Sequence, residues 1–363
     1  MSEKAQRNPG SHVLIILASL VVVIGGLKVA SGILLPLMVA LFVATLSLPL
    51  LAALQKIGLP RPLAVLLTLA AIVLVFAGLG LLVGGSVTEF TDPQIQASYR
   101  AKFQAAVDRS LSHLDVLLSR MKVDTGGRSA RELIDPNSLL DVGALFGFVG
   151  RTLKQAVSVV SNTFLVILTV IFILFEAAAF PDKIRAAMGH RLGALDRFAG
   201  IKTEIQNYLA IKTMISMTTG ILVGLSLWIL GIDFPLLWGL VAFLCNYIPS
   251  LGSIIAAVPA VMLTIVQVGF GRALIVAAVF LAINIPLGNF LEPYLLGRRL
   301  GLSTLVVFLS LVFWGWVWGP VGMLLSVPLT MIVKIMLEHT EDLRWIAVLL
   351  DARAPDPGRR REG

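Results

Sequence analysis

Charged side chains are scarce in this chain. Aspartate, glutamate, lysine and arginine make up 14% of its 363 residues, whereas an ordinary soluble domain contains about 25%. Apolar residues account for 57% of the chain, and the mean hydropathy is +0.92. A water-soluble core does not need so much apolar surface. Most of the chain is therefore expected to face lipid, which makes the bilayer its principal partner.

Cysteine and the common catalytic motifs are also missing. Cys245 is the only cysteine, which excludes an intrachain disulfide and a cysteine metal cluster. The sequence has no Gly-x-x-x-x-Gly-Lys-Ser/Thr phosphate loop, no Gly-x-Ser-x-Gly and no His-Glu-x-x-His, so it offers no ATP-driven motor and little support for an enzyme. We expect no cofactor and no metal. The net charge of +8 is explained by lysine and arginine in the cytoplasmic loops of a membrane protein. No nucleic-acid partner is therefore expected.

Long apolar runs predict membrane-spanning helices. Helix is the expected state because a segment in hydrocarbon must satisfy its own backbone groups, and the alternation typical of a β-barrel is absent. The first run is too long for a signal peptide and has no small-residue cleavage pattern. The six continuous runs are Val13–Ala30, Ile33–Leu54, Leu63–Val83, Ser158–Phe180, Thr213–Ile232 and Ala273–Phe290.

Two further apolar segments are broken at their centres. Leu236–Val268 is interrupted by Pro249-Ser-Leu-Gly252, and Leu305–Leu337 by Gly319-Pro-Val-Gly322. Each arm has roughly 12 to 17 apolar residues, whereas a comfortable span needs about 20. Each hairpin is therefore expected either to cross twice or to be re-entrant.

The two broken hairpins resemble each other. Both tips are followed by a second proline, Pro259 and Pro328, and both hairpins follow a full span. They would open from opposite faces of the membrane, which is the arrangement of an inverted repeat; chance similarity of apolar sequence is the alternative. The expected fold is an all-α integral membrane protein of about eight transmembrane helices, including these hairpins, with a helical extramembrane insert.

Lysine and arginine predict the orientation. Basic loops follow the second span, the fourth span and the span that ends at Phe290, and Arg359–Arg361 lie in the C-terminal tail. These loops place both termini in the cytoplasm. The expected organisation is an N-terminal membrane region (1–85), an external helical insert (86–155), a transport core (156–340) and a cytoplasmic tail (341–363).

Two amphipathic segments flank the core. Apolar residues from Ile95 to Met121 recur at helical spacing, and this helix is expected to pack against its own bundle or a neighbouring subunit rather than bind a ligand. Thr125–Asp141 is expected to be a loop. The basic segment Asp182–Lys212 is typical of a helix on the membrane surface.

Polar residues within the apolar segments are candidate functional groups. Asn246, Asn284 and Asn289 either contribute to a pathway or join helices by hydrogen bonds. Glu176 and Glu292 are candidates for ion coupling, because an ionisable residue in a membrane segment is a functional hypothesis by default. Their alternatives are a helix-end carboxylate at the interface and, for Glu292, a pair with Arg298 or Arg299.

Three tryptophans precede the second tip. Trp314, Trp316 and Trp318 alternate along the sequence, which is typical of an interfacial aromatic belt. If the hairpin is re-entrant, they would wall a cavity instead.

The hairpin region resembles the autoinducer-2 exporter family of bacterial membrane proteins. The resemblance rests on Asn246-Tyr-Ile-Pro-Ser-Leu-Gly-Ser253, Asn289-Phe-Leu-Glu-Pro-Tyr-Leu-Leu-Gly297, Leu300–Ser310 and Gly315–Leu329. It covers the whole order of elements and is densest from about Ile201 to Lys334. It implies an oligomeric inner-membrane exporter whose small-molecule cargo is the furanosyl quorum-sensing signal derived from dihydroxypentanedione.

The residues that match the family pattern are the candidate transport pathway. The matching residues are Asn246, Pro249, Gly252, Pro259, Glu292, Pro293, Gly297, Pro320, Gly322 and Pro328. Asn284 and Asn289 are added to this pathway as polar residues of the same region. We expect the two tips to form two halves of one site placed for alternating access. The alternatives are a sodium (or other cation)/proton antiporter of the same architecture, and a non-transporting scaffold that binds a partner through the insert.

Overall fold

The computed structural model describes residues 9–120, 147, 165–176, 192–296, 302–338, 340 and 344–351. The chain divides into two compact units, and each unit is built from segments that are separated in the sequence. Unit 1 comprises Met1–Gly58, Phe164–Ile205 and Gly301–Gly363, and unit 2 comprises Leu59–Thr163 and Gln206–Leu300. The expected loop Thr125–Asp141, Gly297, Arg298, Arg299 and the tail after Asp351 lie outside the described residues.

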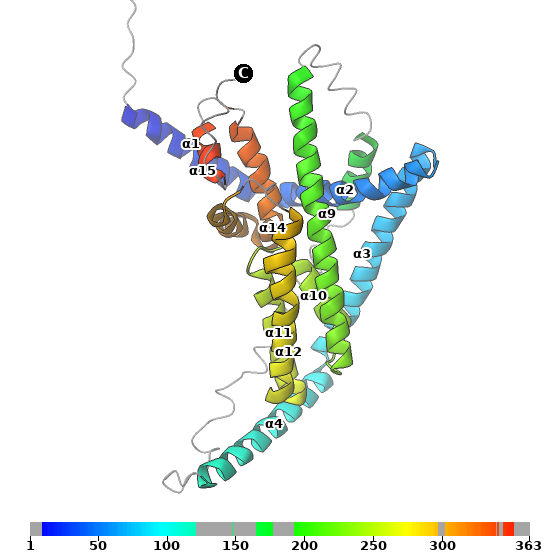
Figure 1. Ribbon diagram of the computed structural model, residues 1–363, viewed down its shortest axis with the longest axis vertical. Helices are drawn as coiled ribbons and strands as arrows, with labels where there is room; N and C mark the ends of the chain where they lie inside the picture. The colour runs from blue at the N-terminus through cyan, green and yellow to red at the C-terminus, as the bar shows by residue number, and fades with distance from the viewer. Residues whose placement is uncertain are drawn as a thin grey trace, which may run out of the picture. The chain divides into compact units, whose positions relative to one another are not determined.

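The described residues form helices and no strand, as predicted. Five stretches within them are long and apolar enough to cross a membrane. They are α2 (Ser31–Lys56), Arg61–Ser86 of α3 (Arg61–Thr91), Ile205–Ile229 of α9 (Leu192–Ile229), Phe270–Leu295, and α14 (Thr304–Glu338). Shorter apolar helices include most of α1 (Pro9–Val29) and Leu165–Glu176 within the fourth predicted span. Figure 1 shows these elements.

The second broken hairpin is a real reversal within α14. Gly319 has φ 66° and ψ −149°, a conformation that suits glycine and interrupts the helix. The indole Nε1 of Trp314 donates a hydrogen bond of 3.1 Å to Oγ1 of Thr330, 16 residues further along the chain. In a straight helix these residues would be about 24 Å apart. The two arms therefore fold back on each other at Gly319.

The tryptophans of this hairpin form the core of unit 1 with α1 and α2. Trp314 and Trp318 are buried, and Nε1 of Trp318 donates to the backbone oxygen of Leu27 at 3.0 Å. Only Trp316 is exposed, and Nζ of Lys28 lies 4.2 Å from the centre of its ring. The interfacial-belt interpretation is therefore wrong for Trp314 and Trp318, which pack inside the protein because their indole N–H groups find partners there.

The first broken hairpin consists of α10 (Pro235–Cys245) and α11 (Gly252–Val268). At 1.5 Å per residue, α10 is about 16 Å long, against about 30 Å for the hydrocarbon core. At the tip, a Cβ on Gly252 would lie 1.8 Å from the backbone oxygen of Cys245. In the second hairpin, a Cβ on Gly322 would lie 2.0 Å from the backbone oxygen of Trp314. Both tips thus need glycine for the same kind of close backbone approach.

The helices α9 and α10 cross at glycines. A Cβ on Gly220 would lie 2.7 Å from the backbone oxygen of Gly239 and 2.8 Å from Cβ of Phe243. One turn further, a Cβ on Gly224 would lie 3.3 Å from the backbone oxygen of Pro235. The pair Gly220-x-x-x-Gly224 on α9 is the small-residue pattern that lets membrane helices approach closely.

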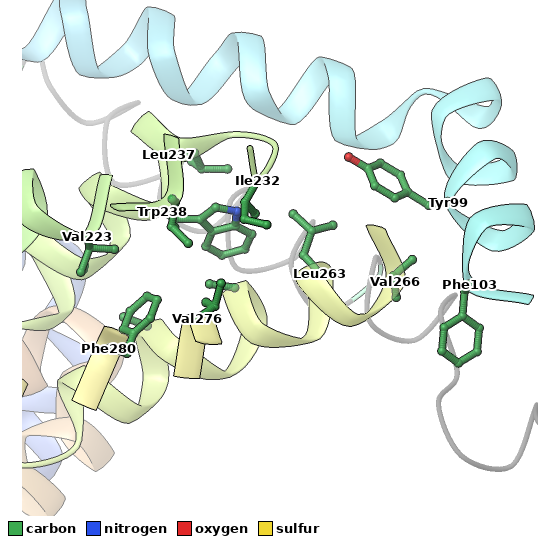
Figure 2. Close-up of a cluster of buried hydrophobic side chains, with 14 of the residues drawn as sticks. Tyr99, Phe103, Val223, Ile232, Leu237, Trp238, Leu263, Val266, Val276 and Phe280 are labelled. Carbon is green, nitrogen blue, oxygen red and sulfur yellow. The ribbon is translucent and has the colours of Figure 1, made fainter. Parts of the chain in front are cut away.

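The predicted amphipathic helix of the insert is confirmed as α4 (Pro93–Arg120). Tyr99, Phe103, Val107 and Leu111 are buried at a spacing of four residues, in one cluster with side chains of α9, α10, α11 and α12 (Phe270–Asn284). Figure 2 shows Tyr99 and Phe103 beside Leu263 and Val266 of α11. The apolar stripe of α4 therefore packs on its own unit, as expected.

A polar network joins α4 to the base of the first hairpin. The phenol of Tyr99 donates to Oδ2 of Asp233, and the backbone N–H of Asp233 donates to Oε1 of Gln267 at 3.0 Å. The amide nitrogen of Gln267 in turn donates to the backbone oxygen of Gly231 at 3.1 Å. Burial, and secondly the neighbouring carboxylate of Asp233, raise the pKa of Tyr99. The phenol therefore stays protonated and keeps its role as donor.

Two helices differ from the prediction. The span predicted at Ala273–Phe290 is formed by α12 and a π-helical segment η1 (Ile285–Leu291), and α13 (Glu292–Leu296) follows directly. Pro286 lies within η1 and lacks the backbone donor of a regular α-turn. From Leu192 onward, the segment predicted to lie on the membrane surface is instead continuous with the next span in α9.

Replacing Gly220 by alanine should destabilise the protein by about 1–3 kcal/mol, because the new methyl group overpacks the crossing of α9 and α10. The matched control is Gly78→Ala on α3, where a Cβ meets nothing within 4 Å. That change should raise stability by a few tenths to about 1 kcal/mol. Thermal unfolding in detergent measures both variants, and equal melting temperatures would contradict the close crossing.

Trp314→Phe should lower the free energy of unfolding by about 1–3 kcal/mol, because Thr330 loses its buried donor and the core loses apolar volume. Trp316→Phe is the control, since that ring is 60% exposed. A larger loss of melting temperature for Trp316→Phe than for Trp314→Phe would contradict the folded-back hairpin.

Candidate functional site

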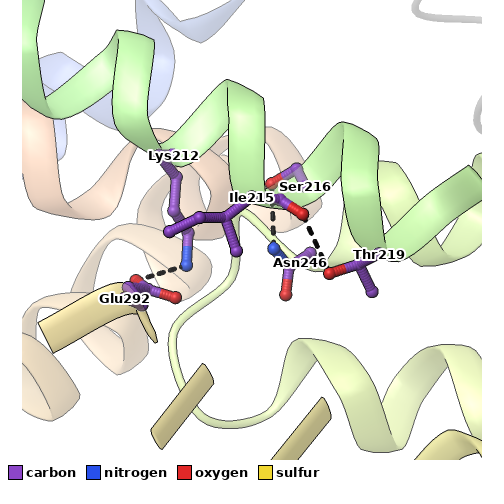
Figure 3. Close-up of polar contacts among 6 residues, drawn as sticks. All are labelled: Lys212, Ile215, Ser216, Thr219, Asn246 and Glu292. Atoms are coloured by element: carbon purple, nitrogen blue, oxygen red, sulfur yellow. Dashed lines mark hydrogen bonds and ion pairs between the residues drawn. The ribbon is translucent and has the colours of Figure 1, made fainter. Parts of the chain in front are cut away.

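The candidate site lies in unit 2, where one face of α9 meets the tip of the first hairpin and the start of α13. Lys212, Ser216 and Thr219 recur on α9 at spacings of four and three residues, so they share one face of the helix. Figure 3 shows this face directed towards Asn246 and Glu292. Three segments far apart in sequence thus bring their polar groups together.

An ion pair between Lys212 and Glu292 is the strongest contact of the site. Nζ of Lys212 lies 2.6 Å from Oε1 of Glu292, and the two side chains are 3% and 20% exposed. Both residues fall within stretches apolar enough to span a membrane. An isolated charge there would be costly, so each group is retained because the other compensates its charge.

This pair corrects the treatment of two residues. The sequence predicts that Lys212 ends a basic segment on the membrane surface, but its side chain is buried inside unit 2. Glu292 is predicted to act in ion coupling or to pair with Arg298 or Arg299, which lie outside the described residues, and the partner that the structure shows is Lys212. Position along the sequence was a poor guide because α9 extends without a break across the predicted loop boundary.

The π-helical segment η1 determines where Glu292 points. It ends at Leu291, immediately before Glu292. A π-turn holds more residues than an α-turn, so every residue after it is rotated relative to a continuous α-helix. Such segments are frequent at functional sites. Here the first residue after the π-turn is Glu292, whose side chain contacts Lys212 of α9.

Neutral polar groups extend the site along α9. Nδ2 of Asn246 donates to Oγ of Ser216 at 3.0 Å, and the phenol of Tyr247 donates to Oγ1 of Thr213 at 2.6 Å. The hydroxyl of Thr219 donates to the backbone oxygen of Ile215. The bonds of Asn246 and Tyr247 fix the first tip against α9, whereas the bond of Thr219 lies within α9. The role of Asn246 as a hydrogen-bonding link between helices is therefore observed.

The other predicted residues of unit 2 do not join these contacts. Asn284 donates to the backbone oxygen of Phe280 at 2.8 Å, one turn earlier on α12, and Asn289 and Pro293 are exposed. Gly252 and Pro259 are buried, and Pro249 is half-buried at the tip. These tip residues shape the hairpin that presents Asn246.

The remaining predicted residues belong to unit 1 or lie outside the described residues. Gly322 and Pro328 are buried and Pro320 is exposed at the second tip, and Glu176, the last described residue of its segment, is exposed. Gly297 lies outside the described residues. The two tips thus belong to different units, and a joint site remains a prediction.

Sequence reasoning missed Lys212, Thr213 and Ser216. A signal was available, because these polar residues open an otherwise apolar run and Lys212 and Ser216 share a helical face. Glu292 was identified without its partner, since no local pattern connects residues 80 positions apart.

The site offers hydrogen bonds without net charge. The ion pair is neutral as a whole, and the hydroxyl and amide groups beside it are both donors and acceptors. Such an arrangement suits a neutral, hydroxyl-rich solute, because a charged solute would leave one charge unpaired in a medium of low polarity.

Comparison with known proteins identifies a family of transporters. The AI-2E family transporter profile matches residues 17–342. The chain is 40% identical over 343 residues to the AI-2 transport protein TqsA of Escherichia coli K12, covering 94% of this chain and 96% of that protein. YhhT of Escherichia coli K12, whose name assigns transport without a substrate, is 34% identical over 346 residues, covering 95% and 96%. A transport protein of Haemophilus influenzae is 37% identical over 350 residues, covering 95% and 98%.

A double-mutant cycle on Asn246 and Ser216 should give a coupling free energy of about 0.5–1.5 kcal/mol, the usual range for hydrogen bonds between membrane helices. The variants are Asn246→Leu, Ser216→Ala and their combination, compared by unfolding of the purified protein. Thr218→Ala is a matched control, because the hydroxyl of Thr218 bonds only one turn back on an exposed face of α9. Strictly additive effects for Asn246 and Ser216 would contradict the contact.

Proposed function

This chain belongs to the AI-2E transporter family, and from that membership we propose that it exports autoinducer-2, a small polar signalling molecule. Membership makes the protein a multi-pass membrane transporter of the bacterial inner membrane rather than an enzyme. The identity of the cargo is the part of this function that we propose. Other relatives over nearly the whole chain have names that specify no cargo.

The observation that carries the proposal is the similarity to TqsA over 94% of the chain, together with the chemistry of the site. The Lys212–Glu292 pair is neutral overall, and on the same face of α9 Ser216 accepts a hydrogen bond from Asn246 of the first tip. A furanosyl signal is uncharged and rich in hydroxyl groups, and hydroxyl and amide side chains are the groups that bind such a solute.

We further propose the arrangement in the membrane. Both termini lie in the cytoplasm because the basic loops favour that side. The protein assembles as a homo-oligomer, the two hairpins open from opposite faces, and their tips alternate in giving access to the solute. The shared close approach at Gly252 and Gly322 supports this arrangement, because in both tips a glycine packs against a backbone carbonyl group.

Cation/proton antiport is the second candidate function. Its support is Glu292, a carboxylate that lies within a candidate span and is 20% exposed. The scaffold alternative has less support, because the buried stripe of α4 packs against its own unit and is not available to a partner.

Deletion of the gene should raise the ratio of intracellular to extracellular autoinducer-2, and overexpression should lower it. The measurement is a bioassay of both fractions at matched cell density. Asn246→Leu at unchanged membrane abundance should reduce export about tenfold or more, because a buried polar contact of the site is lost. Val75→Leu, on an exposed apolar face of α3, is the control. A ratio that does not respond to deletion or overexpression would rule out this cargo.

A further inference from the structure

Two lysines are the only charged side chains that are buried among the described residues, and one of them is Lys212 in the candidate site. The other, Lys334 in unit 1, lies 2.9 Å from Oδ2 of Asp351 near the end of α14. Both lysines lie inside candidate spans, but the partner of Lys212 is a carboxylate in another candidate span, whereas Asp351 lies outside the candidate spans. A buried lysine in a membrane segment needs a reason, since its ammonium group is costly to remove from water.

The ammonium group of Lys212 occupies the position where a cation bound to Glu292 would lie. Carboxylate, amide and hydroxyl oxygens are the ligands that hard cations such as sodium take in proteins. Glu292 supplies the carboxylate, and Ser216 lies one turn beyond Lys212 on α9, where it accepts a hydrogen bond from Asn246 of the first tip. The Nζ–Oε1 distance of 2.6 Å leaves no room for an ion between the two groups.

We propose that Lys212 is a resident cation that replaces a dissociable coupling ion at Glu292. This inference rests on the proposed function in one respect, that solute passes the site formed by α9, the first tip and α13. A covalently attached ammonium group neutralises the carboxylate in every state of the protein, whereas a bound ion would do so only when present. The site therefore works without an external cation, and Lys212 positions Glu292 for the solute.

The proposal assigns the site a substrate class as well. With Lys212 in place, a neutral solute leaves the charge balance of the site unchanged. A cationic solute would compete with Lys212 for Glu292, and an anionic solute would leave Glu292 without its partner; both cost free energy in a buried site. The protein should thus prefer uncharged polar solutes and transport them at a rate independent of sodium.

The test removes the resident cation and supplies a free one. In the full-length protein, Lys212→Met deletes the charge and replaces the ammonium-bearing chain by an unbranched apolar chain that is one heavy atom shorter. Its melting temperature in choline chloride should fall by about 5 °C or more, because Glu292 loses its partner. Sodium or methylammonium at equal ionic strength should restore most of the loss, while the melting temperature of the wild-type protein should be the same in all three salts.

Two variants control for other effects of the substitution. Lys212→Arg keeps a cation at the site and should show no response to sodium. The double variant Lys212→Met/Glu292→Gln has neither charge, so its melting temperature should not respond to sodium or methylammonium. If Lys212→Met cannot be purified, Lys212→Gln takes its place with the same expectation.

Flux provides a second measurement that is separate from stability. In membrane vesicles, export of autoinducer-2 by the wild-type protein should be equal in sodium and choline, and Lys212→Met should lose about tenfold or more in choline and recover in sodium. The inference is overturned if the wild-type protein requires sodium, or if folded Lys212→Met responds to neither cation. The melting temperatures need no cargo, so they test the resident cation even if autoinducer-2 proves to be the wrong solute.

Discussion

The absence of water in the hydrocarbon core is the constraint on which this structure depends. A polar group there has to find its partner within the protein, or it costs several kcal/mol. The solutions take three forms here. Thr264 donates to the backbone oxygen of Ala260 on its own helix, Trp314 donates across a hairpin, and Lys212 pairs with Glu292 between helices. The last form uses full charges, which makes it the most expensive to break.

The same constraint explains the geometry of the hairpins. Helix α10 is shorter than the hydrocarbon core is thick, and the backbone groups at helix ends need partners wherever lipid offers no hydrogen bonds. The chain responds by closing each tip tightly, with Gly252 against the backbone oxygen of Cys245 and Gly322 against that of Trp314. The turns themselves differ, since Ser250 has φ 61° in the first tip and Gly319 has φ 66° in the second. What the tips have in common is the close approach of glycine to a carbonyl group, not one turn type.

Packing at the candidate site depends on small residues as well as on polar ones. Gly220 and Gly239 bring α9 and α10 close enough for Asn246 to reach Ser216 and for Tyr247 to reach Thr213. On the other side of α10 and α11, Tyr99 and Phe103 of α4 complete the apolar core of unit 2. The insert thus packs against the base of the first hairpin, while α9 fixes its tip.

By itself, the sequence determined the helical class, most helix positions, the two breaks at proline and glycine, and the buried stripe of α4. These features follow from local composition and period, because a helix in lipid is specified by its own residues. The tertiary structure alone decided that Lys212 faces Glu292, that Trp314 and Trp318 are core residues, and that η1 interrupts the span before Glu292. Each of these depends on a contact between distant segments or on a single extra residue in a turn, and neither leaves a periodic signal in the sequence.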